Sequence, residues 1–252
     1  MAAPVEKRRP ILGVSTKMYF SVARTREYVD ALGVRFAADN NNNTATASLL
    51  DRLDVFVIPD FVTLSATVAQ LRAVDARPRR ETDATTAAKA AAAARHGLVP
   101  LVCVGEVDPP PGNTTADGGH DATAAAAAAA TVLAQVTPVL AAVPDDAEVL
   151  IAYEPVWAIG AAQPASAAHV RAVVSGVRVG CAVVSGVRAG CAAALQQRGG
   201  GGNARMRILY GGSAGPGLFK QLAGVVDGLF LGRFGHDPDA FMQTAREIAE
   251  TV

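Results

Sequence analysis

Six short apolar segments, separated by longer alanine-rich stretches, restrict the fold of this chain more than any other feature of its sequence. Most are nearly continuously apolar and lack alternation with polar residues, which is typical of parallel strands covered on both faces. The predicted strands are Ile11–Thr16, Val55–Pro59, Val99–Gly105, Glu148–Tyr153, Arg207–Tyr210 and Gly228–Gly232. Strands that alternate with helices favour an α/β fold with a parallel sheet.

The stretches between these strands have the composition and spacing of helices. The predicted helices are Val22–Ala38, Leu64–Val74, Glu81–His96, Ala122–Ala142, Ala165–Gln197 and Pro238–Thr251. Thr82 and Asp83 are start signals for the third of them, and Gly97 is a stop signal. No stretch of about 18 residues or more is expected to span a membrane, because the longest apolar runs are short and alanine-rich.

Three segments are predicted to be insertions or local duplications. Asp39–Thr44 contains four consecutive asparagines, and 109–121 is rich in proline, glycine and threonine, so both are expected to form surface loops. Residues 172–191 read AVVSGVRVGC and then AVVSGVRAGC, with nine of ten positions identical, which indicates a tandem duplication. Cys181 and Cys191 are therefore interpreted as copies of one residue, not as a metal-binding pair.

Charge and cysteine content exclude several classes of partner. The chain has 23 basic and 23 acidic residues and no long run of like charge, so neither a nucleic acid nor a membrane is an expected partner. Its three cysteines are too few and too scattered for a disulfide framework or a paired zinc site. We expect no metal and no cofactor, and a location in the reducing cytoplasm. The first ten residues lack the apolar region of a signal peptide.

The most informative stretch is residues 152–160, which read AYEPVWAIG. It places a carboxylate, Glu154, at the end of a predicted strand, where barrel enzymes carry catalytic groups, and it includes the only tryptophan of the chain, Trp157. Four further blocks occur in order along the chain: STKM at 15–18, LVCVGE at 101–106, YGGS at 210–213 and LGR at 231–233.

Together these five ordered blocks resemble the triosephosphate isomerase family, and the resemblance runs from Ile11 to Ala249. It implies a single domain over residues 1–252 with the fold of a (β/α)8 TIM barrel, of which about six parallel strands are recognisable. It also implies an enzyme of glycolysis and gluconeogenesis that interconverts glyceraldehyde 3-phosphate and dihydroxyacetone phosphate. The reaction moves a proton by way of an enediolate.

The resemblance assigns roles to particular residues. Glu154 is expected to be the base that takes the proton beside the carbonyl, and Lys17 the fixed cation near the carbonyl and the phosphate. The residues expected to bind the phosphorylated substrate are Ser15, Gly160, Ala162, Gly211, Gly212, Ser213, Gly232 and Arg233. Pro155–Ala165 resembles the lid that closes over the substrate and excludes water.

One part of the family pattern is missing from this chain. The family carries an electrophilic histidine on its fourth strand, in a Gly-His-x-Glu-Arg-Arg motif. The four histidines of this chain lie outside such a motif, and each is expected at the surface or at a helix end: His96, His120, His169 and His236. About 40 residues separate Pro59 from Val99, whereas two βα units need roughly 60. The third and fourth βα units are therefore expected to be largely deleted.

This deletion leaves several interpretations open. The family forms homodimers through the loop after the third strand, so that contact is expected to be absent. The chain is either an isomerase weakened by the loss of the histidine, a remnant that binds sugar phosphates without turnover, or the product of an incorrectly assembled gene. Ser15 replaces a family asparagine, and Gly232-Arg233 replaces a double glycine. Both changes resemble a divergent branch that acts on four-carbon sugar phosphates.

Overall fold

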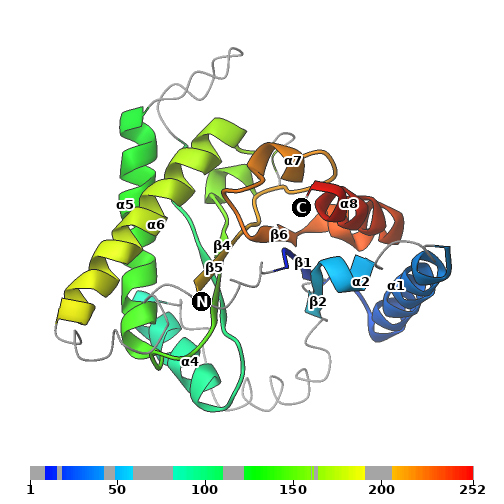
Figure 1. The fold of residues 1–252 in the computed structure, drawn as a ribbon, viewed down its shortest axis with the longest axis horizontal. Helices are drawn as coiled ribbons and strands as arrows, with labels where there is room; N and C mark the ends of the chain where they lie inside the picture. The colour runs from blue at the N-terminus through cyan, green and yellow to red at the C-terminus, as the bar shows by residue number, and fades with distance from the viewer. Residues whose placement is uncertain are drawn as a thin grey trace, which may run out of the picture. The chain divides into compact units, whose positions relative to one another are not determined.

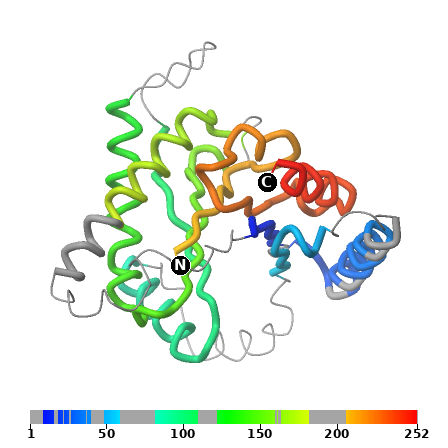
Figure 2. Tube along the Cα trace, in the orientation of Figure 1, coloured from blue at the N-terminus to red at the C-terminus, as the bar shows by residue number. Residues whose placement is uncertain are grey.

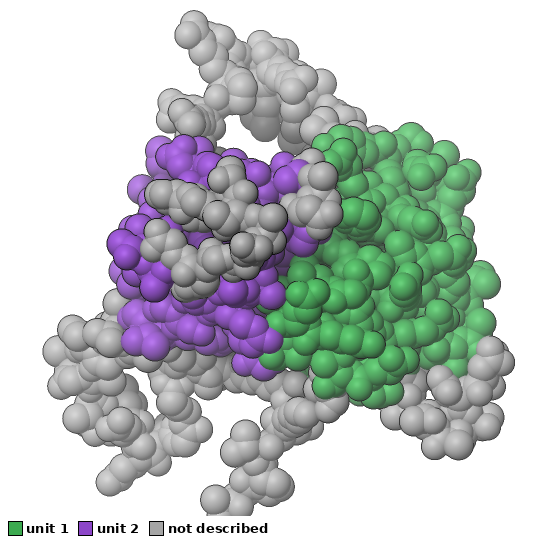
Figure 3. All heavy atoms as spheres, turned by 90° about the horizontal axis from the view of Figure 1, so that it is seen from above, with its two compact units in different colours: residues 1–75, 214–223, 227–252 green, residues 76–213, 224–226 purple. Residues whose placement is uncertain are grey.

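The structure is a computed structural model, and Figure 2 distinguishes its described residues from the grey remainder. The described residues are 9–15, 19–42, 49–58, 82–109, 122–159, 161, 164–190 and 206–251. The chain forms two compact units, coloured separately in Figure 3. The first unit comprises 1–75, 214–223 and 227–252, and the second comprises 76–213 and 224–226.

All six predicted strands form, each with ends within two residues of the prediction. Three belong to the first unit: β1 (Ile11–Ser15), β2 (Asp54–Ile58) and β6 (Gly228–Leu231). Three belong to the second: β3 (Leu101–Val104), β4 (Val149–Tyr153) and β5 (Met206–Tyr210). All the recorded pairings are parallel, with helices between the strands along the chain.

In the first unit, β1 pairs with β2 on one side and β6 on the other, so that Leu12 lies between Val55 and Leu229. The helices of this unit are α1 (Val22–Asn42), α2 (Leu49–Arg52), α7 (Phe219–Leu222), the 3-10 turn η3 (Arg233–His236) and α8 (Pro238–Thr251). Helix α8 buries Phe241 and Ile248, and the Phe241 ring lies edge-on to Phe36 of α1. These apolar contacts hold α1 and α8 together.

Helix α1 is longer than predicted and corrects the loop expected at Asp39–Thr44. It continues through Asn42, and only residues 43 and 44 lie outside the described part. Asparagine is a weak helix former, but its penalty is a fraction of about 1 kcal/mol per residue. The buried side chains of Tyr28 and Leu32 anchor the preceding turns, and tertiary packing of this kind outweighs local propensity.

In the second unit, β4 pairs with β3 and β5, which places Ile151 between Val102 and Ile208. The other elements are α4 (Asp83–Arg95), α5 (Ala122–Ala142), the 3-10 turn η2 (Val156–Ala158) and α6 (Ala167–Gly190). Helices α5 and α6 pack along each other (Figure 1). A Cβ added at Gly176 of α6 would lie 2.8 Å from Cβ of Ala129 of α5, so small residues permit their close approach.

Helix α4 begins and ends where its sequence signals predict. The Thr82 side chain accepts a hydrogen bond from the N–H of Thr85, and the Thr85 hydroxyl accepts one from the N–H of Thr82. This reciprocal arrangement is a capping box. Gly97 follows the helix with a φ of +74°, a left-handed conformation that favours glycine.

Helix α5 differs from the expectation that no segment would resemble a membrane span. In the described part of the chain, it is the one helix long and apolar enough to cross a membrane by length and composition. The mean hydropathy of α5 is high because the helix is rich in alanine, which counts as apolar although its side chain is small. The helix packs against α4 and α6, and a core helix of a globular unit passes the same test.

Four strands are covered on both faces as predicted, and two are not. Strands β4, β5 and β6 are buried throughout, and β1 is buried except at Ser15. Every residue of β2 is half-buried, and β3 exposes Cys103 and half-exposes Leu101. For β2 and β3, a continuously apolar sequence therefore did not predict full burial.

Several predictions fall wholly or partly outside the described residues. The predicted helix Leu64–Val74 and residues 110–121 are among them, and the duplicated segment lies on α6 as far as Gly190. A single barrel domain with insertions therefore stays a prediction.

Candidate active site

Hydrogen bonds to the end of β3, a neighbour of β4, fix the backbone around Glu154. Strand β4 ends at Tyr153, and the next residue is Glu154, whose N–H donates to the carbonyl of Val104 over 2.7 Å. The N–H of Val156 then donates to the carbonyl of Glu106 over 2.9 Å. The predicted base thus stands at the carboxyl end of the central strand of this sheet, on a segment with regular hydrogen bonding.

Two glycines allow other strand ends to approach Glu154. A Cβ added at Gly211, just after β5, would lie 2.7 Å from Oε1 of Glu154 and 2.6 Å from its Cγ. A Cβ added at Gly105, just after β3, would collide with the backbone carbonyl of Glu154. The carboxylate therefore packs directly against the backbone of β5, which requires glycine at position 211.

Glu154 also lines a cavity of about 280 Å³. Its wall includes Cys103 and Gly105 from the end of β3, Thr82 at the start of α4, and Ile159 beyond η2. A cavity of this volume, at the carboxyl ends of parallel strands, is the usual place for a small substrate in α/β proteins.

The predicted lid, Pro155–Ala165, is held at both ends by residues that follow or end β5. The Ser213 hydroxyl donates to the carbonyl of Ala158 over 2.7 Å. The hydroxyl of Tyr210 accepts a hydrogen bond from the N–H of Ala165 over 3.0 Å. Ser213 has a φ of 48°, an uncommon conformation for a residue other than glycine and one that often marks functional sites.

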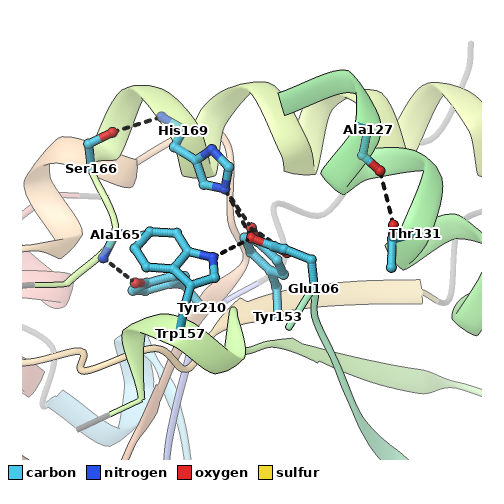
Figure 4. A network of polar contacts seen from close by, with 9 residues as sticks. All are labelled: Glu106, Ala127, Thr131, Tyr153, Trp157, Ala165, Ser166, His169 and Tyr210. Atoms are coloured by element: carbon cyan, nitrogen blue, oxygen red, sulfur yellow. Dashed lines mark hydrogen bonds and ion pairs between the residues drawn. The ribbon is translucent and has the colours of Figure 1, made fainter. Parts of the chain in front are cut away.

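A group of four polar side chains connects the lid to β3, β4 and α6; three of them are buried and the fourth, Trp157, is half-buried (Figure 4). We name it the Glu106 cluster; it consists of Glu106, Tyr153, Trp157 and His169. Nε1 of Trp157 donates to Oε1 of Glu106 over 2.9 Å, and the Tyr153 hydroxyl donates to the same carboxylate over 3.1 Å. Nε2 of His169 lies 3.2 Å from Oε1 of Glu106 and 3.1 Å from the Tyr153 hydroxyl.

The electrostatics of this cluster keep Glu106 ionised. Burial acts to raise the pKa of the Glu106 carboxyl, but hydrogen bonds from His169 and Trp157 outweigh it, and the pKa is lowered. Burial, together with the negative charge of Glu106, raises the pKa of Tyr153, so its hydroxyl keeps its proton. The result is a buried carboxylate surrounded by hydrogen-bond donors.

His169 lies at a helix end, which the expectation allowed, but it is buried and not at the surface. Its side chain is 7% exposed, because it faces inward from the first turn of α6. Val173 and Val177 follow it at four-residue intervals, and both are buried. That spacing could have identified His169 as an inward-facing residue. The sequence interpretation assigned no role to Glu106 or His169.

The remaining histidines differ in position. His96 is exposed at the carboxyl end of α4, as expected, and His120 lies outside the described residues. His236 ends η3 in the first unit and is half-buried, with Nε2 2.9 Å from the carbonyl oxygen of Ser15.

The structure places the predicted site residues in three groups. Glu154, Gly211, Gly212 and Ser213 come together in the second unit. Ser15, Gly232 and Arg233 belong to the first unit, where Gly232 follows β6 and a Cβ added to it would meet no atom within 4 Å. Three residues lie outside the described part: Lys17, Gly160 and Ala162. A common cavity for Lys17, Glu154 and Gly232 stays a prediction.

Among the residues that the structure describes, no group of three or more histidine, cysteine, aspartate or glutamate side chains could hold a metal ion.

Comparison with known proteins identifies the class to which this fold and site belong. The family model described as triosephosphate isomerase matches residues 75–248. An L-erythrulose-1-phosphate isomerase from Pectobacterium atrosepticum is 34% identical over 280 residues, which covers 94% of this chain and 95% of the relative. The chain belongs to the triosephosphate isomerase family, and its six parallel strands, three in each unit, are consistent with an incomplete α/β barrel of that family.

Two further relatives match over shorter regions. An L-erythrulose-1-phosphate isomerase from Rhizobium etli is 32% identical, covering 68% of this chain and 56% of the relative. A triosephosphate isomerase from Synechococcus sp. is 30% identical, covering 64% and 52%. The chain thus spans about half the length of these two relatives. The Pectobacterium alignment covers 280 positions, more than the 252 residues of this chain, so that relative has residues that this chain lacks.

Proposed function

We propose that this protein is an intramolecular isomerase that interconverts the aldose and ketose forms of a four-carbon sugar phosphate. The observation that carries the proposal is the position of Glu154, which ends the central strand, packs against Gly211 and lines a cavity. A carboxylate at this place can take a proton from the carbon beside a carbonyl and return it to the former carbonyl carbon. Membership of the family supports the assignment of this chemistry.

The choice of a four-carbon substrate rests on the extent of similarity. The L-erythrulose-1-phosphate isomerase from Pectobacterium aligns with 94% of the chain, whereas the triosephosphate isomerase from Synechococcus aligns with 64%. Ser15 and Arg233 both depart from the family pattern, and both departures resemble the branch that acts on four-carbon sugar phosphates. Isomerisation of glyceraldehyde 3-phosphate is the second candidate, favoured by the family model over residues 75–248.

The experiment assays the purified chain with L-erythrulose 1-phosphate and with glyceraldehyde 3-phosphate in D2O. Proton transfer through an enediolate incorporates deuterium beside the carbonyl, which NMR detects together with the product. Higher kcat/KM for the four-carbon substrate supports the proposal, and higher kcat/KM for the triose favours the second candidate. Binding of inorganic phosphate with no turnover of either sugar contradicts both and identifies a non-catalytic remnant.

The absent histidine motif sets the expected scale of activity. Loss of one preorganised hydrogen-bond donor commonly lowers kcat by about 10² to 10³. We therefore expect turnover at least about a hundredfold below that of a relative with this motif. Equal rates would mean that another group has taken the role of the histidine. A cytoplasmic location, a homodimer and a place in glycolysis stay predictions from the sequence.

A further inference from the structure

The start of the predicted lid and the helix that follows the lid are both hydrogen-bonded to one oxygen of one buried side chain. Trp157, where the lid begins, donates from Nε1 to Oε1 of Glu106. His169, in the first turn of the helix after the lid, places Nε2 3.2 Å from the same oxygen. Figure 4 shows the two rings converging on Glu106 from η2 and α6. Their centroids are 5.7 Å apart, with the ring planes at 70°.

The hydrogen-bonding pattern determines which atom of His169 carries a proton. An ionised carboxylate only accepts, and the single proton of the Tyr153 hydroxyl is directed to Glu106. Nε2 of His169 therefore faces two oxygens that can both act as acceptors, which requires an N–H at Nε2. Glu106 thus binds three donors, from Tyr153, Trp157 and His169. Buried networks in which each polar group is satisfied hold their members in one arrangement.

Few other charged groups face His169 from the elements packed against it. The end of β3 contributes Glu106 and, across a cavity of about 380 Å³ that His169 also lines, the exposed Asp108. Strand β4 contributes the Tyr153 hydroxyl at 3.1 Å. Helix α5 lines this cavity with alanines and Thr131, which are uncharged. Glu106 is therefore the dominant partner of the ring.

We propose that His169 is a positioning residue for the isomerase reaction. By holding the Glu106 carboxylate together with Trp157, it fixes the start of the lid and the first turn of α6 relative to the strand end that carries Glu154. This inference rests on the proposed function. His169 is not among the described residues that line the cavity beside Glu154, so it acts through Glu106 and not on the substrate.

The first test replaces the donor while preserving the size of the side chain. His169→Phe keeps a planar ring without an N–H, whereas His169→Gln keeps an N–H at a similar reach. A displacement of about 1 Å at a catalytic group can cost on the order of 10²-fold in rate. We expect H169F to lower kcat by roughly ten- to a hundredfold with KM nearly unchanged, and H169Q to retain most of the activity.

Two further variants control for folding and for general loss of a histidine. His96→Gln changes an exposed histidine of α4 and should leave kcat and KM unchanged. His169→Asn introduces an amide that is one methylene shorter than that of H169Q. Its kcat should therefore be lower than that of H169Q, and this comparison remains possible even if H169F does not fold. Circular dichroism identifies the folded variants. Equal kcat for H169Q and H169N, or wild-type kcat for H169F, would overturn the proposal.

The second test uses the fact that Trp157 is the only tryptophan of the chain. Its emission therefore reports on the Glu106 cluster directly, without substrate. We expect H169F to shift the emission maximum and increase quenching by acrylamide, while H169Q and H96Q match the wild type. Because this measurement needs no turnover, it separates the two proposals. Absence of isomerisation contradicts the proposed function, whereas unchanged emission in folded H169F contradicts the role of His169.

Discussion

Strands β3 and β4 lie side by side in the second unit, yet their burial differs along their whole length. Every residue of β4 is buried, whereas β3 exposes Cys103 and half-exposes Leu101. The first unit repeats the contrast, because β1 is buried except at Ser15 and β2 is half-buried throughout. The two less buried strands, β2 and β3, are those between which the family's third and fourth βα units are expected to be missing.

This contrast shows that an apolar run in the sequence does not by itself mean that a strand is covered on both faces. The predicted base of the candidate site is carried by a fully buried strand and not by one of the two less buried strands. Glu154 and Gly211 come directly after the fully buried strands β4 and β5, where the neighbouring backbone fixes them. The predicted base therefore lies in a well-packed region of the second unit.

The largest expected effect comes from neutralising the base. Glu154→Gln should lower kcat by about 10² to 10⁴, the usual contribution of a general base. Glu154→Asp should lower it by roughly 10², because the carboxylate retracts by about 1 Å. The matched control is Glu148→Gln, which makes the same change just before the opposite end of β4. Equal losses in E154Q and E148Q, measured by NMR in D2O, would remove Glu154 from the mechanism.

The burial contrast itself is tested by one substitution in two strands of one sheet. Leu209 of β5 is fully buried, whereas Leu101 of β3 is half-buried. Leu209→Ala should lower the free energy of unfolding by about 2 to 5 kcal/mol, and Leu101→Ala by about 1 kcal/mol. Urea denaturation measures both. Similar losses for the two variants would show that β3 is as well covered as β5.

The sequence predicted the strands well, because each strand is a short apolar run. It also predicted that Glu154 follows a strand end, because Glu154 lies in a distinctive block. It did not predict the exposure of β2 and β3, which depends on neighbours that are distant along the chain. It missed the continuation of α1 through Asn42, which depends on tertiary anchoring. It also missed the role of His169, since the partners Glu106 and Tyr153 come from two other segments of the chain.

A smaller effect on catalysis is expected from filling the space between β5 and the base. A Cβ at Gly211 would lie 2.7 Å from Oε1 of Glu154, so Gly211→Ala should displace the carboxylate. We expect kcat to fall roughly tenfold, less than the approximately 10²-fold cost of a full 1 Å displacement. The control is Gly33→Ala on α1, where an added Cβ meets no atom within 4 Å. Unchanged kcat in G211A would show that Glu154 does not act from the observed position.

The smallest expected effect is a difference in acid stability between the Glu106 cluster and the surface. The pKa of Glu106 is lowered in the folded protein, so its ionised form stabilises the fold above the ordinary glutamate value of 4.5. This contribution declines as the pH falls below 4.5 and is lost once the pH passes the lower folded-state pKa. Glu106→Gln should therefore lower the Tm at pH 7 and flatten its decline in acid. Asp146→Asn, at an exposed turn, should change neither. Thermal unfolding followed by circular dichroism from pH 7 down to about 3 measures both variants. An acid decline in E106Q as steep as in the wild type would mean that Glu106 is not the carboxylate that the fold keeps ionised.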